Sequence, residues 1–187
     1  SHVFHRNARA VPPVASHGDG VFVVDTEGSR YLDASGGAAV SCLGHSHPQV
    51  TQAIKAQVDK LAFTHTGFFT SQAMEDLADK MIASAPDGFA SVYFVSGGSE
   101  AMEAALKLAR QYAVEKGEPE RRHFITRRQS YHGNTLGALS AGGNMWRREM
   151  FEPILLKTQM IAPCYSYRDQ RDDESEAEYG LRVANEL

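Results

Sequence analysis

The sequence is poor in cysteine and has neither a long apolar run nor an excess of positive charge. Its two cysteines, Cys42 and Cys164, lack a Cys-x-x-Cys spacing and are too few to staple a secreted scaffold, so we expect buried or unreactive thiols. No apolar stretch approaches the roughly 18 to 20 residues of a membrane span, and no apolar core follows the basic start as in a signal peptide. We therefore expect a cytoplasmic protein without a membrane partner.

The charge balance also excludes classes of partner. Nineteen Lys and Arg against 23 Asp and Glu leave a net charge of -4, so a nucleic-acid partner is not expected. His45 and His47 are neighbours, but no Cys, Asp or Glu completes a metal-ligand spacing, and we predict no metal site. With 42% hydrophobic and 22% charged residues over 187 positions, the composition is that of a globular domain or part of one.

The first 45 residues are predicted to form an arm, a hairpin and a small-residue stretch. Residues 1–18 contain Pro12 and Pro13 without periodicity, which predicts an extended arm. Short strands at 21–24 and 30–33 flank a glycine-containing loop and predict a hairpin. Small residues then follow at 36–45, where the backbone can approach another surface closely, as packing or as part of a pocket.

Two helices follow. Apolar residues recur at helical spacing over 48–62 after Pro48, and again from a cap at Thr70 or Ser71 up to Pro86. The loop between them carries Phe68 and Phe69. Two readings remain open for these aromatics: burial in the core, or contact with a pocket or a partner chain.

The second half alternates strands and helices. A strand at 92–95, a glycine-rich turn, a helix to residue 117 and a strand at 123–126 form a βαβ unit, which implies a parallel sheet. A helix from 134 to 143 and a strand at 159–162 continue the pattern. A capping box of Ser175 and Glu178 then opens a helix whose apolar stripe stops at the last residue, so we expect a chain cut within an element of a longer protein; the stripe is Tyr179, Val183 and Leu187.

The turn at 96–101 is the most informative segment. It leaves a predicted strand and opens a long helix, so its bare backbone amides at the helix's positive end suit a phosphate, and the Ser99 hydroxyl adds a donor. It is neither a Walker loop nor a dinucleotide fingerprint. Glu100 and Glu103 would have to point away from a bound phosphate. The alternative is an ordinary strand-to-helix turn capped by Ser99.

A second turn, at 130–134, follows the neighbouring predicted strand at the same carboxyl edge of the sheet, where ligands bind in open α/β folds. Tyr131 there can lie flat on a planar ring, and Gly133 removes a side chain that would crowd it. The alternative is a core tyrosine.

Three segments together resemble a known family: YLDASGGAAVSCLGHSHPQV, FVSGGSEAMEAALKLAR and SYHGNTLGALS, in that order. Over roughly residues 19–163 the chain resembles class III aminotransferases, the pyridoxal phosphate (PLP) enzymes of fold type I that include ω-amino acid transaminases. The resemblance implies that Gly98 and Ser99 contact the PLP phosphate and that Tyr131 stacks on its pyridine ring, with His132 and Gly133 beside it. More loosely, it implies substrate-binding roles for Ala38 and Phe68, the latter in a loop near a dimer interface.

The chain also departs from that family. Its members are more than twice as long and carry, downstream, a lysine that binds PLP covalently and an aspartate that pairs with the pyridine nitrogen. Neither motif is present, and all six lysines stand in surface-type contexts. We therefore assign no catalytic residue within the chain and expect it to be inactive by itself.

The resemblance implies an α/β fold, with residues 1–45 contributing an arm and hairpin to a small domain and 46–187 forming the first part of the large, mainly parallel PLP domain. It further implies a homodimeric or larger homo-oligomeric transaminase that moves an amino group from an amine or ω-amino acid to a keto acid. Small side chains at Ala38 and Ala39 favour an ω-amine or ω-amino acid donor with pyruvate as acceptor. The alternatives are a decarboxylase or aminomutase of the same fold, or a non-catalytic phosphate-binding module.

Overall fold

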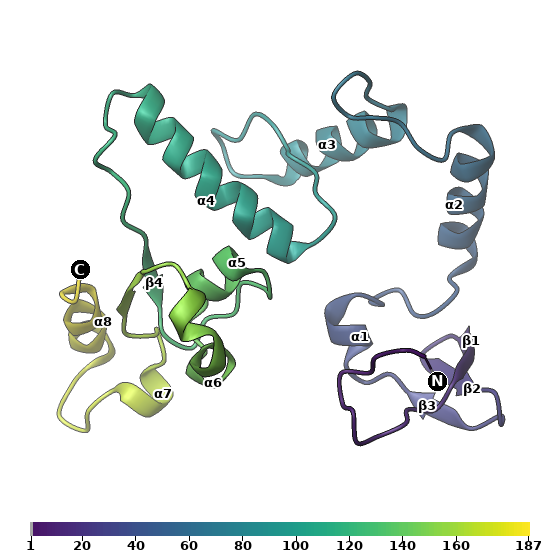
Figure 1. Cartoon of the computed structure of the whole chain (residues 1–187), viewed down its shortest axis with the longest axis horizontal. Coiled ribbons are helices and arrows are strands. Elements are labelled where there is room, and N and C mark those ends of the chain that lie inside the picture. Colours follow the sequence, from purple (N-terminus) through teal and green to yellow (C-terminus); the bar gives the residue numbers. More distant parts are fainter. Residues whose placement is uncertain (1) are drawn as a thin grey trace. The chain divides into compact units, whose positions relative to one another are not determined.

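The computed structural model describes residues 2–187, which form two compact units joined between Asp87 and Gly88 (Figure 1). Within residues 2–187, no helix combines the length and the apolar character that crossing a membrane requires.

The N-terminal unit begins with an antiparallel sheet in the order β1 (Ala15–Asp19), β2 (Phe22–Asp25), β3 (Arg30–Leu32). The predicted hairpin is therefore confirmed. The prediction of an arm throughout 1–18 is wrong at its end, because β1 pairs with β2. The polar β1 sequence has no apolar alternation, so its strand conformation depends on the backbone partner that β2 offers.

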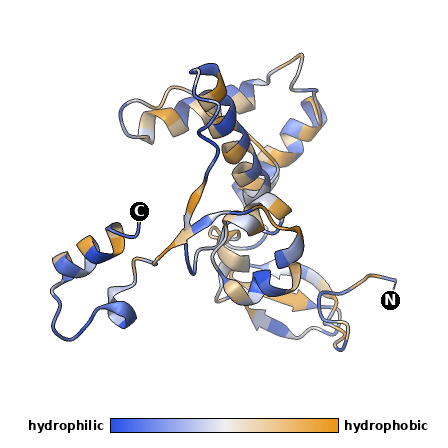
Figure 2. Ribbon diagram, turned by 60° about the vertical axis from the view of Figure 1, so that its left-hand side comes forward, coloured by the Kyte–Doolittle hydropathy of each residue, from blue (hydrophilic) through white to orange (hydrophobic). Residues whose placement is uncertain are grey.

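Helices α2 (Pro48–Lys60) and α3 (Gln72–Ser84) confirm both predicted helices of this unit. Pro48 is the first helical residue of α2, and Ser71 caps α3 by accepting a hydrogen bond from the Met74 amide at 3.4 Å. Figure 2 shows hydrophobic and hydrophilic residues interspersed along the helices. The apolar stripe of α2 is nevertheless exposed, so its spacing predicted a helix without predicting its burial; the stripe is Val50, Ile54, Val58 and Leu61.

The C-terminal unit contains the long helix α4 (Gly98–Glu115) and a parallel pair of strands, β4 (Ile125–Arg127) and β5 (Gln159–Ile161). The helix is confirmed, and the pairing of β4 with β5 is parallel as the predicted sheet implies, but the predicted βαβ unit of 92–126 is not formed. The predicted strand at 92–95 is wrong, since this segment has no strand conformation. A strand needs a neighbouring backbone to complete its hydrogen bonds, and no strand within residues 2–187 pairs with this segment.

Helix α5 (Leu136–Ala141) lies within the predicted 134–143 helix, and its residues from Gly137 onward are buried. It is followed by α6 (Met145–Arg148) and the 3-10 helix η1 (Glu149–Ile154). The buried guanidinium of Arg148 donates to the carbonyl oxygens of Leu139 and Gly142, each at 2.9 Å. It thereby satisfies carbonyls that the end of α5 leaves without a helical partner.

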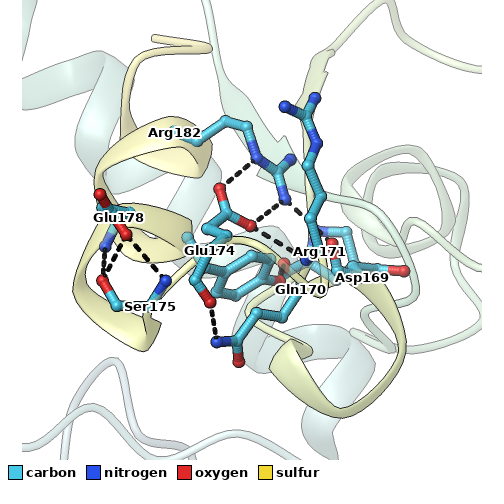
Figure 3. Close-up of polar contacts among 9 residues, drawn as sticks. Asp169, Gln170, Arg171, Glu174, Ser175, Glu178 and Arg182 are labelled. Atoms are coloured by element: carbon cyan, nitrogen blue, oxygen red, sulfur yellow. Dashed lines mark hydrogen bonds and ion pairs between the residues drawn. The ribbon is translucent and has the colours of Figure 1, made fainter.

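The chain continues through α7 (Ser166–Asp169) to α8 (Glu176–Ala184), whose predicted capping box is present (Figure 3). Glu174, just before it, accepts from Arg182 Nε at 2.7 Å, and this guanidinium lowers the pKa of Glu174 from 4.5 to about 2. Tyr179 and Val183 pack on Ala162 in the core. The predicted extension of the stripe to Leu187 is wrong, because α8 ends at Ala184 and Leu187 is exposed.

Candidate cofactor site

The two turns singled out in the sequence are in direct contact in the C-terminal unit. The Ser99 hydroxyl oxygen accepts a hydrogen bond from the Asn134 amide at 2.9 Å. Gly133 has a φ of +132°, and a Cβ added there would lie 2.8 Å from Ser99 Cα and 2.9 Å from Ser99 Cβ. The structure therefore brings Gly98, Ser99 and Gly133 together. The absence of a side chain at Gly133 is what permits the close approach.

The start of α4 fits an anionic group. Its N-cap residue, Gly97, is extended and makes no side-chain cap, so the first amides of an 18-residue helix are left to other partners. A Cβ on Gly98 would meet nothing within 4 Å, so there is open space next to these amides. The Ser99 oxygen accepts from Asn134, and its own proton is still available for donation to a phosphate oxygen.

The two acidic residues near the start of this helix, Glu100 and Glu103, differ in orientation. Glu103 turns to α5, where its carboxylate accepts from the Gly137 amide at 2.8 Å. The Thr135 hydroxyl, and then the Gly137 amide, lower the pKa of Glu103 below its usual 4.5 against the effect of burial. Glu100 instead folds back, with Oε2 2.8 Å from where a Gly97 Cβ would be. Phosphate binding would require the exposed Glu100 side chain to turn into solvent.

Tyr131 is 63% exposed, so the core-tyrosine alternative is wrong. The guanidinium of Arg147 lies 5.1 Å from the centre of its ring and 4.6 Å from that of Trp146. A cation on one face of an aromatic ring leaves the opposite face for a planar ligand. Arg147 was missed by the sequence analysis, because no motif or periodicity marks it. His132, beside Tyr131, is half-buried.

Ala38 belongs to the N-terminal unit, in the short turn α1 (Gly36–Ala39). Residues Gly36 to Ala39 have φ values of 57°, 58°, 61° and 67°, so this is a left-handed turn. Such a conformation costs an L-residue roughly 1–2 kcal/mol, and strained backbone of this kind gathers at binding sites. The substrate-binding role of Ala38 remains a prediction.

The carboxylate of Asp33 stabilises the α1 turn through polar contacts. It accepts from the Gly37 amide at 2.9 Å and the Ser41 hydroxyl at 2.7 Å, and its Oδ2 lies 2.9 Å from His45 Nε2. The Gly37 amide and then the Ser41 hydroxyl lower the pKa of Asp33 from 3.8 to about 2. Asp33 was predicted to end a strand, but β3 ends at Leu32, and the role of Asp33 in the turn was missed although small residues follow it up to Ala39.

We expect Asp33→Asn to lower the free energy of unfolding at neutral pH. A carboxylate whose folded-state pKa is depressed stabilises the fold above its unfolded pKa of about 3.8, and this contribution is lost as the pH falls through about 2. The difference between the two proteins should therefore shrink between pH 4 and pH 2 in urea titrations of the full-length gene product. Asp87→Asn, at an exposed carboxylate after α3, is the control. A difference that persists undiminished at pH 2 would contradict the assignment.

The other predicted features have mixed outcomes. Phe68 is 80% exposed, and Phe69 is exposed as well, so their burial in the core of this chain is wrong. Phe68 instead packs on His65, with ring centres 5.1 Å apart.

Both cysteines are exposed free thiols, so burial is also wrong for them. All six lysines are exposed, as predicted. No cluster of three or more potential metal ligands occurs in the described part of the chain.

The model of the family described as aminotransferase class-III matches residues 3–187. The chain belongs to the class-III aminotransferase family. The resemblance noted in the sequence is thus confirmed. An uncharacterized aminotransferase of Schizosaccharomyces pombe is 39% identical to this class-III chain over 188 residues, which cover 100% of the chain and 41% of the relative. The acetylornithine aminotransferase of Aquifex aeolicus is 36% identical over 170 residues, covering 90% of the chain and 42% of that relative.

The class-III chain thus spans about two-fifths of the length of the curated relatives it matches. Among solved structures, the omega transaminase from Pseudomonas jessenii in complex with PMP is similar with a TM-score of 0.91 and 29% identity, covering 100% of this chain and 42% of that chain. The predicted α/β class and fold type I are therefore confirmed.

Proposed function

We propose that this chain is the N-terminal part of a PLP-dependent transaminase, which moves an amino group from an amine or ω-amino acid donor to a keto acid. The contact between the Ser99 and Gly133 turns is the observation that carries the proposal, because it joins the start of α4, which suits an anion, to the turn that carries the exposed Tyr131. The family of the chain and the PMP-bound omega transaminase it resembles support the same activity.

In this proposal the residues of the chain bind and orient the cofactor. The Gly98 and Ser99 amides and the Ser99 hydroxyl hold the phosphate, while Tyr131 fixes the plane of the ring, with His132 and Gly133 beside it. When bound, PLP supplies the electron sink that no amino-acid side chain provides. We place the lysine and the ring-nitrogen aspartate of the family outside this chain, and residues 1–45 and 46–187 in the small and the large domain respectively.

The substrates and the assembly are also proposals. The small side chains of Ala38 and Ala39 favour a donor with its amine on a terminal carbon and pyruvate as acceptor, with Phe68 near the substrate. The similarity to an acetylornithine aminotransferase and to an omega transaminase supports amino-group transfer in general. Phe68 and Phe69 are exposed and so available to a second copy, which supports a homodimer, for which we propose a cytoplasmic location.

The absorbance spectrum of the full-length gene product tests this function. We expect a visible band from bound PLP that borohydride removes, and loss of that band as an ω-amine donor is added in the absence of a keto acid. Bovine serum albumin given the same PLP and desalted alike controls for adventitious binding to surface lysines. A colourless protein that gains no band with added PLP would contradict the cofactor, and a band discharged by α-amino acids alone would contradict the proposed donor.

A further inference from the structure

We propose that Glu103 is a positioning residue, which holds the Tyr131 turn against the start of α4 and so sets the distance between the two halves of the cofactor site. The inference rests on the proposed function, because it concerns how the two turns of the same cofactor site are held in position. It explains the presence of an acidic side chain near the start of a helix that is proposed to bind an anion, because a carboxylate turned toward that anion would repel it.

Ser99 and Glu103 form a two-point clamp on α4. They are four residues apart and therefore lie on one face of the helix. Ser99 accepts from the Asn134 amide at 2.9 Å, and Glu103 accepts from the Gly137 amide at 2.8 Å. Asn134 lies in the short segment that leads from the Tyr131 turn into α5, and Gly137 lies in the first turn of α5. The segment is thus attached to the helix at two places, and two attachments fix both its position and its direction.

Gly137 makes the second attachment possible. A Cβ at Gly137 would lie 2.7 Å from Glu103 Oε1 and 2.8 Å from Glu103 Cδ, so only glycine admits the carboxylate at this distance. Gly137 is also buried, as are the four residues of α5 that follow it. The Glu103 carboxylate therefore binds a helix that is buried and cannot move along with a displaced Glu103 side chain.

The clamp acts on Tyr131 through the two residues that separate it from Asn134, His132 and Gly133. Tyr131 is exposed, and its ring contacts Arg147, which is itself exposed on the short helix α6. Packing around the Tyr131 side chain therefore restrains it weakly, and the backbone attachments hold the turn in place. Since misplacement of a binding group by about 1 Å is enough to weaken a preorganised site strongly, loss of the clamp should be felt in cofactor binding.

A double-mutant cycle in the full-length gene product tests this inference, with the dissociation constant of PLP as the readout. Glu103→Ala is expected to raise that constant about tenfold. Glu103→Gln retains an oxygen of the same reach and should restore it to within about threefold of the unsubstituted protein. Glu115→Ala removes the same side chain from the exposed far end of α4 and is expected to change nothing.

The decisive comparison uses Tyr131→Ala. If Glu103 acts by placing Tyr131, the protein with both alanines should bind PLP no more than about twofold worse than Tyr131→Ala alone, because contacting or coupled residues are not additive. A full tenfold further loss in the double variant would overturn the inference and indicate a general structural role. If Glu103→Ala does not fold, Glu103→Asp, which shortens the reach by one methylene, enters the same cycle, and an effect below twofold overturns the inference. Failure of the unsubstituted protein to bind PLP would instead overturn the proposed function, and this inference with it.

Discussion

Gly133→Ala is expected to lower the free energy of unfolding by about 3 kcal/mol and to abolish measurable PLP binding. Two effects combine. The φ of +132° is a conformation that residues with a side chain rarely adopt, at a cost of about 1–3 kcal/mol, and the new Cβ would overlap Ser99 at a cost of similar size. The turn can relieve the overlap only by moving away from α4, which separates the two halves of the proposed site. Urea unfolding and PLP titration of the full-length gene product measure the two effects.

Gly180→Ala is the matched control. Gly180 is exposed within α8, and a Cβ there would meet nothing within 4 Å. Because glycine in a helix interior is less favourable than alanine by roughly 0.5–1 kcal/mol, this substitution should stabilise the protein by about that amount and leave PLP affinity unchanged. Equal stability of the two alanine variants would contradict the contact between the Gly133 turn and Ser99.

Gly98→Val is expected to weaken PLP binding at least tenfold, or about 1.4 kcal/mol, while the fold stays intact. The open space around Gly98 lets the new side chain fit against the protein. The same side chain would occupy the space that a phosphate needs to reach the helix amides. This separation of binding from stability distinguishes Gly98 from Gly133, where both properties fall together.

Gly98→Ala, a smaller change at the same position, should give an intermediate loss of affinity. Equilibrium PLP titration provides the affinity, and thermal unfolding without PLP reports the stability. Unchanged PLP affinity in Gly98→Val would remove the phosphate assignment, and a large loss of stability would show that the space around Gly98 is not open.

The sequence predicted helices and caps well because their signals are local. Pro48 and Ser71 mark the starts of α2 and α3, and Ser175 with Glu178 marks the start of α8, all with partners within a few residues. The strand expected at 92–95 did not form, and the unexpected β1 did. A strand is completed by a backbone that is distant in sequence, so local residues determine it poorly.

The sequence by itself determined the family, the helices and the two glycine-bearing turns, since each depends on residue types at short spacing. Only the tertiary structure decided how those turns meet. Ser99 reaches the Asn134 amide 35 residues away, and Glu103 reaches the Gly137 amide across 34 residues. The guanidinium of Arg147 lies over the Tyr131 ring, and no sequence motif predicts this contact. Such contacts depend on which distant segments the fold brings together. Every residue except proline has a backbone amide, so the type of the donating residue does not reveal the hydrogen bond.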